Sequence, residues 1–199
     1  MGCCCWKKWG VLCSLVLLLC ACKEAPKPLD FLGNNMTGIA VGQNFSLTDF
    51  NGQHRTLQDF HGKVVLIFFG YTRCPEVCPT TMGELMQTMR ALGPDADQVQ
   101  VLFVSLDPTR DSLAALKAYT ASFDPRFLGL TGSETEIAET AKAFKVVYKK
   151  VPDASGTDYG IDHSAGTYLY DRQGELRGYV KYGSGAKIFT HDVRELLQQ

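Results

Sequence analysis

Two cysteines four residues apart are the side chains of this chain best suited to chemistry. They lie in the segment Gly70-Tyr71-Thr72-Arg73-Cys74-Pro75-Glu76-Val77-Cys78-Pro79. Pro79 suits the first turn of a helix, and the positive N-terminal end of a helix favours thiolate over thiol. Thiolates bind soft metal ions and also exchange disulfides, so this motif predicts either a metal site or a redox pair.

His163 is the candidate third ligand. It belongs to the triplet Asp162-His163-Ser164, which directly precedes a predicted strand over 167–170. We expect the segment before that strand to pack against the cysteine loop. Two thiolates and one imidazole make a soft site with few ligands, whereas a structural zinc site uses four protein ligands. No further cysteine is available to complete a zinc site, so the residue types favour copper.

The hydrophobic pattern around these residues predicts an α/β domain. Continuous apolar runs at 63–70 and 99–106 are typical of strands buried on both faces, and the spacing over 80–92 predicts an amphipathic helix. The remaining predicted elements are strands at 45–48, 53–57, 127–130, 167–170 and 175–181, and helices at 111–123, 133–144 and 188–197.

Strands that alternate with helices imply a mixed sheet covered on both faces. The expected architecture is therefore a thioredoxin-like fold with a central mixed sheet flanked by helices and an added N-terminal β-hairpin, which turns at Asn51-Gly52. Residues 149–162 are predicted to form a long loop, because Pro152, Gly156 and Gly160 interrupt them.

Three separated blocks resemble the Sco/SenC family of copper-binding proteins, which serve cytochrome oxidase assembly. The blocks are Phe69-Gly70-Tyr71-Thr72 with the cysteine motif that follows, Ser105-Leu106-Asp107-Pro108-Thr109-Arg110-Asp111, and Asp162-His163-Ser164 before Tyr168-Leu169. The resemblance covers residues 41–199. One departure is Arg73, where members often carry histidine, and it implies a different local charge and redox potential.

This resemblance implies a function for the domain. In the family, the copper ligands match Cys74, Cys78 and His163. The implied role is a copper chaperone that takes one copper ion, Cu(I) or Cu(II), from an upstream copper donor. It would deliver this ion to the dinuclear copper centre of cytochrome c oxidase subunit II, or mature that centre reductively.

A thiol–disulfide reductase is the alternative, and it leaves open whether the protein is an enzyme. It would keep the cysteines of the oxidase copper site reduced, using Cys74 and Cys78 but not His163. Two features favour metal binding. The cysteines are separated by three residues rather than by the two of common redox motifs. The chain also has no proline after Pro152, although thioredoxin-like oxidoreductases usually carry one near the position of Ala165.

The loop after the predicted strand 99–106 carries Asp107, Arg110 and Asp111. One interpretation is that an aspartate caps the following helix. The other is that the loop supports the site or docks a partner. Asp162 is a further candidate, as an acceptor that orients the neighbouring imidazole of His163.

The N-terminus resembles a bacterial lipoprotein signal. Lys7 and Lys8 precede an apolar run at 11–22, which is shorter than the roughly 20 residues of a membrane span. The expected organisation is a signal peptide over 1–21, a lipid-bearing Cys22 that begins a membrane tether over 22–42, and a copper-binding domain over 43–199. An uncleaved N-terminal anchor is the alternative. Either places the domain on the periplasmic side of a bacterial cell envelope, at a membrane.

Cysteine usage and composition support this organisation. Of eight cysteines, five precede position 21 and one is Cys22, so the expected domain keeps only Cys74 and Cys78. Two cysteines do not form a disulfide-stapled scaffold, which favours a chemical role. The formal net charge is −1, and basic runs never exceed two residues, so a nucleic-acid partner is not expected.

Overall fold

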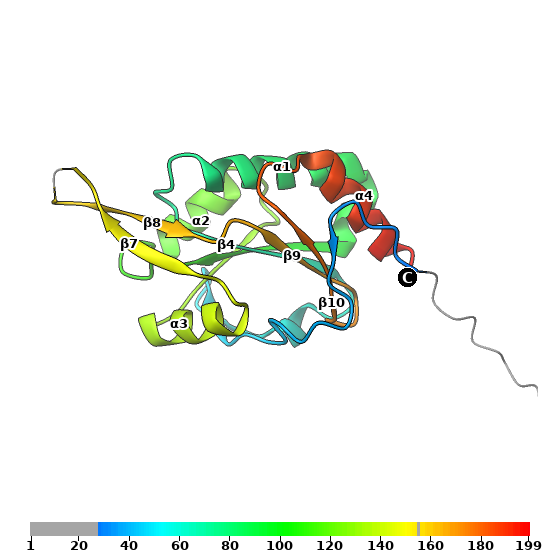
Figure 1. The fold of residues 1–199 in the computed structure, drawn as a ribbon, viewed down its shortest axis with the longest axis horizontal. Helices are drawn as coiled ribbons and strands as arrows, with labels where there is room; N and C mark the ends of the chain where they lie inside the picture. The colour runs from blue at the N-terminus through cyan, green and yellow to red at the C-terminus, as the bar shows by residue number, and fades with distance from the viewer. Residues whose placement is uncertain (1–27, 155) are drawn as a thin grey trace, which may run out of the picture.

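A central sheet with helices on both faces forms the body of the protein (Figure 1). The computed structural model describes residues 28–154 and 156–199. The strands are β1 Asn34–Asn35, β2 Leu47–Asp49, β3 His54–Arg55, β4 Val64–Gly70, β5 Val99–Ser105, β6 Leu128–Thr131, β7 Tyr148–Pro152, β8 Tyr159–His163, β9 Thr167–Tyr170 and β10 Leu176–Val180. The α-helices are α1 Val77–Leu92, α2 Leu113–Ala121, α3 Glu134–Ala143 and α4 Ala186–Leu197, with short 3-10 helices at Leu57–Phe60 and Gly93–Gln98.

The main sheet has the strand order β1-β10-β9-β4-β5-β6-β2-β3. Its centre, β4-β5-β6, is parallel, whereas β9 pairs with β4 in the antiparallel direction. The β2-β3 hairpin adds antiparallel strands at the β6 edge. This arrangement confirms the expected α/β class, the mixed sheet and the added N-terminal hairpin.

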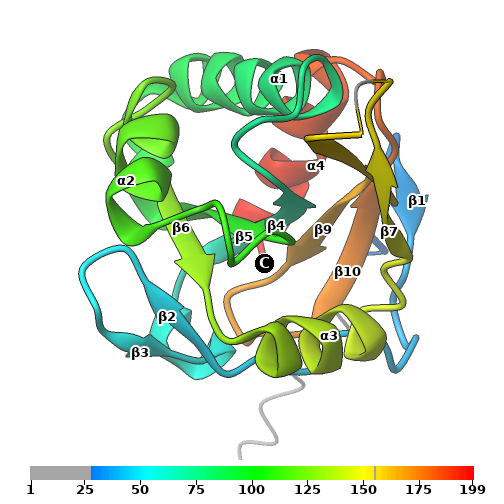
Figure 2. The same ribbon diagram turned by 90° about the vertical axis from the view of Figure 1, so that its left-hand side faces the viewer.

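Side chains of β4 alternate between two hydrophobic layers. Leu66 and Phe68 pack in the layer that contains residues of α1, α2 and α4. Val65 and Ile67 face the opposite layer, which α3 covers. Figure 2 shows α1, α2 and α4 on one side of the sheet and α3 on the other. Burial on both faces explains the unbroken apolar run of β4.

The prolines and glycines of 23–42 predict extended or turning backbone and no packed element, and this prediction is wrong for residues 29–42, which pack onto the domain. β1 pairs with β10, and the backbone N–H groups of Leu32 and Gly33 donate to the buried carboxylate of Asp192 on α4. Proline, glycine and asparagine in this segment indicated turns but carried no sign of the distant acceptor. Residues 1–27, with the expected signal peptide and Cys22, lie outside the described residues.

The predicted loop over 149–162 is also wrong, because β7 and β8 form an antiparallel hairpin there. Figure 1 shows it projecting from the end of the molecule opposite the C-terminus. Most of β7 is exposed, so the strand has no buried face and no alternating hydrophobic pattern. Its partner strand supplies the backbone hydrogen bonds that define it.

Candidate metal centre

The two cysteines lie where the central strand β4 passes into α1. Cys74 is in the connecting loop, and its backbone N–H donates to the carbonyl oxygen of Tyr71. Cys78 is the second residue of α1, and its side chain is fully buried. The backbone N–H of Cys78 donates to Cys74 Sγ over 3.4 Å. The sulfur of Cys74 thus accepts one of the N–H groups that the start of the helix leaves unpaired.

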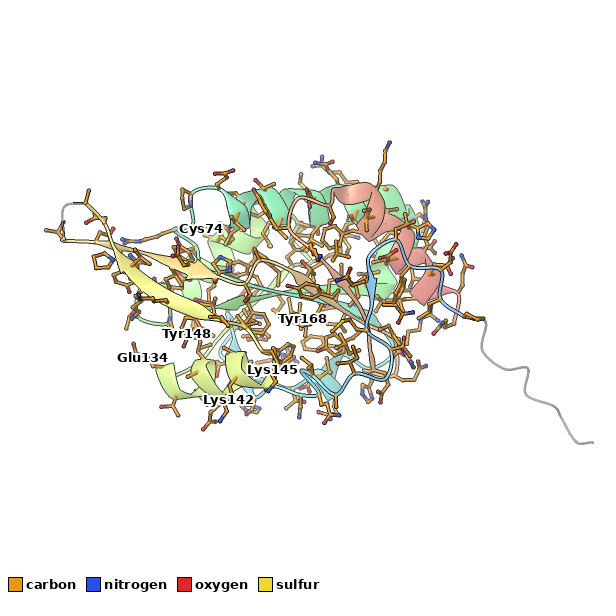
Figure 3. All side chains as sticks on the ribbon, viewed as in Figure 1. Cys74, Glu134, Lys142, Lys145, Tyr148 and Tyr168 are labelled. Carbon is orange, nitrogen blue, oxygen red and sulfur yellow. The ribbon has the colours of Figure 1, made fainter. Side chains whose placement is uncertain are left out.

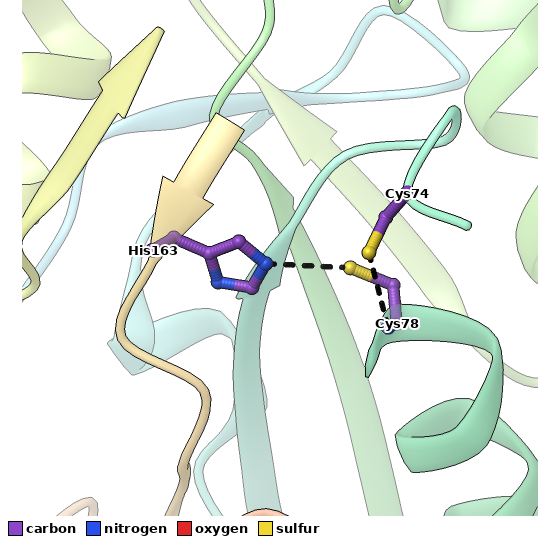
Figure 4. Close-up of side chains that lie close together, drawn as sticks. All are labelled: Cys74, Cys78 and His163. Carbon is purple, nitrogen blue, oxygen red and sulfur yellow. Dashed lines mark hydrogen bonds between the residues drawn. The ribbon is translucent and has the colours of Figure 1, made fainter. Parts of the chain in front are cut away.

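His163 approaches from the other side, at the end of β8. Its Nε2 lies 3.6 Å from Cys78 Sγ (Figure 4). Its Nδ1 lies 2.9 Å from the carbonyl oxygen of Ser164. The imidazole ring also packs edge-on against the rings of Phe68 and Tyr71. In the tautomer that donates the Nδ1 proton to that carbonyl, the lone pair of Nε2 is available to a metal ion. In the other tautomer, Nε2–H donates toward the cysteines.

Together these residues form a three-donor group. The ligand atoms of Cys74, Cys78 and His163 all lie within 4.8 Å of one another. Ligands bound to an ion at about 2.0–2.3 Å lie roughly 3.5–4 Å apart. Only a small contraction therefore separates this arrangement from a bound state. The donor set, two sulfurs and one nitrogen, fits a soft metal ion.

One proton between the two sulfurs determines their ionisation. The thiol of Cys78 donates to Cys74 and lowers the pKa of Cys74 to about 4, while His163 and backbone N–H groups of the helix start act in the same direction and burial opposes them. The same shared proton, together with burial, raises the pKa of Cys78. These shifts favour a thiolate on the half-exposed Cys74 and a thiol on the buried Cys78.

Gly70 makes room for the buried sulfur. A Cβ at this last residue of β4 would lie 2.5 Å from Cys78 Sγ and 3.1 Å from the ring of Phe103. Only glycine therefore leaves space for the thiol. Sequence reasoning missed this role, because Gly70 looks like an ordinary end to an apolar run.

The carboxylate of Asp111 supports the cysteine loop. It is buried and accepts hydrogen bonds from the backbone N–H and hydroxyl of Thr72 and from the hydroxyl of Ser105. The N-cap of α2 is Ser112, whose side chain accepts from the N–H of Ala115. Of the two interpretations of this aspartate, the structure favours site support over helix capping.

Asp162 does not have the orienting role considered for it. Its side chain is exposed, and the Nδ1 of His163 pairs with the backbone carbonyl of Ser164. A carbonyl partner has no side-chain signature, so the sequence could not indicate it.

None of the helices in the described part of the chain has the length and apolar character of a membrane span.

The SCO1/SenC family model matches residues 34–198. The chain belongs to this family. It is 41% identical over 158 residues to the mitochondrial SCO2 homolog of Bos taurus, a match that covers 78% of this chain and 59% of the relative. The chain thus spans about three fifths of the length of that mitochondrial protein.

Solved structures of this family share the fold. ScoI of Bradyrhizobium japonicum, solved with copper bound, is 43% identical, with a TM-score of 0.72 and coverage of 79% of this chain and 99% of that chain. BsSco, described as having a disulfide switch and as a member of the Sco family of cytochrome c oxidase assembly proteins, is 23% identical, with a TM-score of 0.63 and coverage of 86% and 98%. These likenesses confirm the thioredoxin-like fold expected from the sequence.

Proposed function

We propose that this protein is a copper chaperone that binds one copper ion through Cys74, Cys78 and His163. The observation that carries the proposal is the convergence of the three donor atoms within 4.8 Å. A relative of the same fold, 43% identical, has been solved with copper bound. Two thiolates and an imidazole prefer copper or zinc among divalent and monovalent ions, and a three-donor set suits Cu(I) better than a tetrahedral zinc.

The proposed acceptor is the dinuclear copper centre in subunit II of a cytochrome c oxidase. A relative of this fold is described as a member of a family of cytochrome c oxidase assembly proteins, which supports this assignment. The burial of the ligands suggests how transfer would proceed. Cys74 and His163 are half-buried while Cys78 is fully buried, so an incoming ligand would replace the outer two donors first and Cys78 last.

A competition titration tests the copper site. The reduced protein is titrated with Cu(I) without oxygen, in the presence of a chelator that absorbs when it binds Cu(I). We expect one ion per chain, and a loss of affinity of about 10-fold or more in His163→Ala, because one of three donors is removed. Binding of equal strength in wild type and His163→Ala would contradict the assignment of the third ligand.

The thiolate–thiol pair also supports a second candidate function, a thiol–disulfide reductase for the oxidase copper site. A low-pKa thiolate on Cys74 beside the thiol of Cys78 is the arrangement that attacks a disulfide and then resolves the mixed intermediate. In that reaction Cys74 and Cys78 become a disulfide while the target's disulfide takes up two electrons and two protons. This activity requires both cysteines and survives His163→Ala, so the same variant separates the two functions.

We further propose that the protein is exported and anchored in a bacterial cell envelope through a lipid on Cys22. The charged start, the short apolar run and the cysteine that follows support this proposal. Growth with a labelled fatty acid should label the wild-type protein and leave Cys22→Ala unlabelled. Equal labelling of both would contradict the anchor without affecting the copper assignment.

An upstream protein would donate the copper.

A further inference from the structure

The loop between β5 and α2 contacts both halves of the metal centre. Toward the cysteines, the carboxylate of Asp111 holds Thr72, which lies two residues before Cys74. Toward the histidine, the same loop contacts β8, the strand that ends at His163. A single loop thus connects the two segments that carry the ligands, although those segments are far apart in the chain.

The contact with β8 is formed by Arg110. Its side chain is only 13% exposed and pairs with the carboxylates of Asp107 and Asp158. The guanidinium also donates to the carbonyl oxygen of Tyr159 over 2.8 Å and lies 3.5 Å from the centre of the Tyr159 ring. We call these four residues the Arg110 latch. A planar guanidinium is suited to all of these contacts at once, and a lysine is not.

Tyr159 adds a second contact between β8 and the β5–α2 loop. Its hydroxyl donates to Asp107 over 2.8 Å, so the first residue of β8 is held at its backbone, at its ring and at its hydroxyl. Asp107 itself is fully buried, and its backbone N–H donates to the hydroxyl of Ser105 at the end of β5. The latch therefore fastens the start of β8 to the end of a central strand of the main sheet.

The hairpin depends on such contacts because it stands apart from the main sheet. β7 and β8 pair with each other and, among the described strands, with no other. Most of β7 is exposed, and Ile161 is the fully enclosed hydrophobic side chain of β8. With so little apolar burial, polar contacts such as the Arg110 latch contribute to holding the strand at the metal centre, beside Ile161 and the ring contacts of His163.

We propose that Arg110 is a positioning residue for His163, and that the latch sets the distance between the imidazole and the two sulfurs. This inference rests on the proposed function in one respect only, namely that Cys74, Cys78 and His163 bind copper. The immobilisation of β8 by the latch is a property of the metal-free protein. The two parts are therefore tested separately.

Amide hydrogen exchange of the metal-free protein tests the immobilisation. In Arg110→Met, we expect the amides of 159–163 to exchange about tenfold faster while the amides of β4 are unchanged. The matched control is Arg126→Met, which also breaks an arginine–aspartate pair, here with Asp124 near the start of β6. Unchanged exchange over 159–163 in Arg110→Met would overturn the proposal.

Copper affinity tests the consequence for the metal centre. We expect Arg110→Met to weaken Cu(I) binding about tenfold, as is usual when a supporting contact of a ligand is lost. In the His163→Ala background, the same substitution should have no further effect, because the residue that it positions is absent. A general structural role would weaken binding equally in both backgrounds, and that result would overturn the proposal.

A milder variant keeps the test decisive if Arg110→Met does not fold. Tyr159→Phe removes the hydroxyl that donates to Asp107 but keeps the ring under the guanidinium. We expect the same effects in the same direction, each smaller. Failure of wild type to bind Cu(I) would count against the proposed function alone, since the exchange experiment still decides whether the latch holds β8.

Discussion

Strands β4 and β7 each lead to one half of the metal centre, but their surroundings are opposite. β4 precedes the cysteine loop and is buried along all seven residues, whereas β7 opens the hairpin of His163 and is exposed at four of five. Hydrophobic packing on both faces holds the cysteine half, and hydrogen bonds, ion pairs and one buried isoleucine hold the histidine half. The metal centre therefore joins a segment held by the hydrophobic core to a segment held mainly by polar contacts.

The largest expected difference between the two strands is the loss of stability when a side chain of each is truncated to alanine. Leu66→Ala in β4 removes a fully buried side chain, so we expect the free energy of unfolding to fall by about 2–5 kcal/mol. Val151→Ala in β7 removes a side chain that is 37% exposed, and we expect a change within about 0.5 kcal/mol. Urea denaturation followed by circular dichroism measures both. Comparable losses would contradict the contrast between the strands.

The pH dependence of Cys74 reactivity measures what each half contributes to the thiolate. With a pKa of about 4, Cys74 of the reduced, metal-free protein should react with iodoacetamide at a nearly constant rate from pH 8 down to pH 6. An ordinary thiol of pKa about 8.5 loses roughly 100-fold over the same interval.

The two partners of Cys74 should differ in this assay. The hydrogen bond from Cys78 is the largest cause of the lowered pKa, and His163 contributes less. We therefore expect Cys78→Ala to move the midpoint of the rate profile toward the ordinary value further than His163→Ala does. A larger shift in His163→Ala would reverse this ranking of the two halves.

Gly70 tests how tightly the cysteine half is packed. Gly70→Ala places a Cβ against Cys78 Sγ, and we expect a loss of about 1–3 kcal/mol in the free energy of unfolding. Gly83→Ala in α1 is the matched control, because a Cβ there meets no atom within 4 Å. We expect that substitution to stabilise the helix by about 0.5–1 kcal/mol. Stability changes of the same sign would contradict this interpretation.

The smallest expected change in stability comes from a substitution in the connection between α3 and the β7-β8 hairpin. Lys145 lies at the end of α3 (Figure 3), directly after the C-cap of the helix. It adopts φ 58°, the left-handed conformation that favours glycine. Lys145→Gly should therefore raise the melting temperature, with a gain of about 0.5–1 kcal/mol. Lys142→Gly, inside the last turn of the same helix, should lower stability by a similar amount. Destabilisation by both would contradict the assignment of strain to Lys145.

Local pattern explains which predictions from the sequence succeeded. The apolar run of β4 and the helical spacing after Pro79 are properties of adjacent residues, and both elements form close to the expected positions. The hairpin over 148–163 was missed for the same reason, since its exposed strand β7 has no hydrophobic period. The roles of Gly70 and Arg110 were also out of reach, because each depends on atoms far away in the chain.

The donor types, the spacing of Cys74 and Cys78 and the candidacy of His163 could all be recognised without a structure, because chemical identity and short-range spacing need no fold. The approach of His163, 85 residues beyond Cys78, to within 3.6 Å of its sulfur depends on how the distant segments pack. That distance follows from the pairing of β9 with β4 and from the contacts that hold β8 against the β5–α2 loop. Both are long-range contacts, which form only when the complete domain packs.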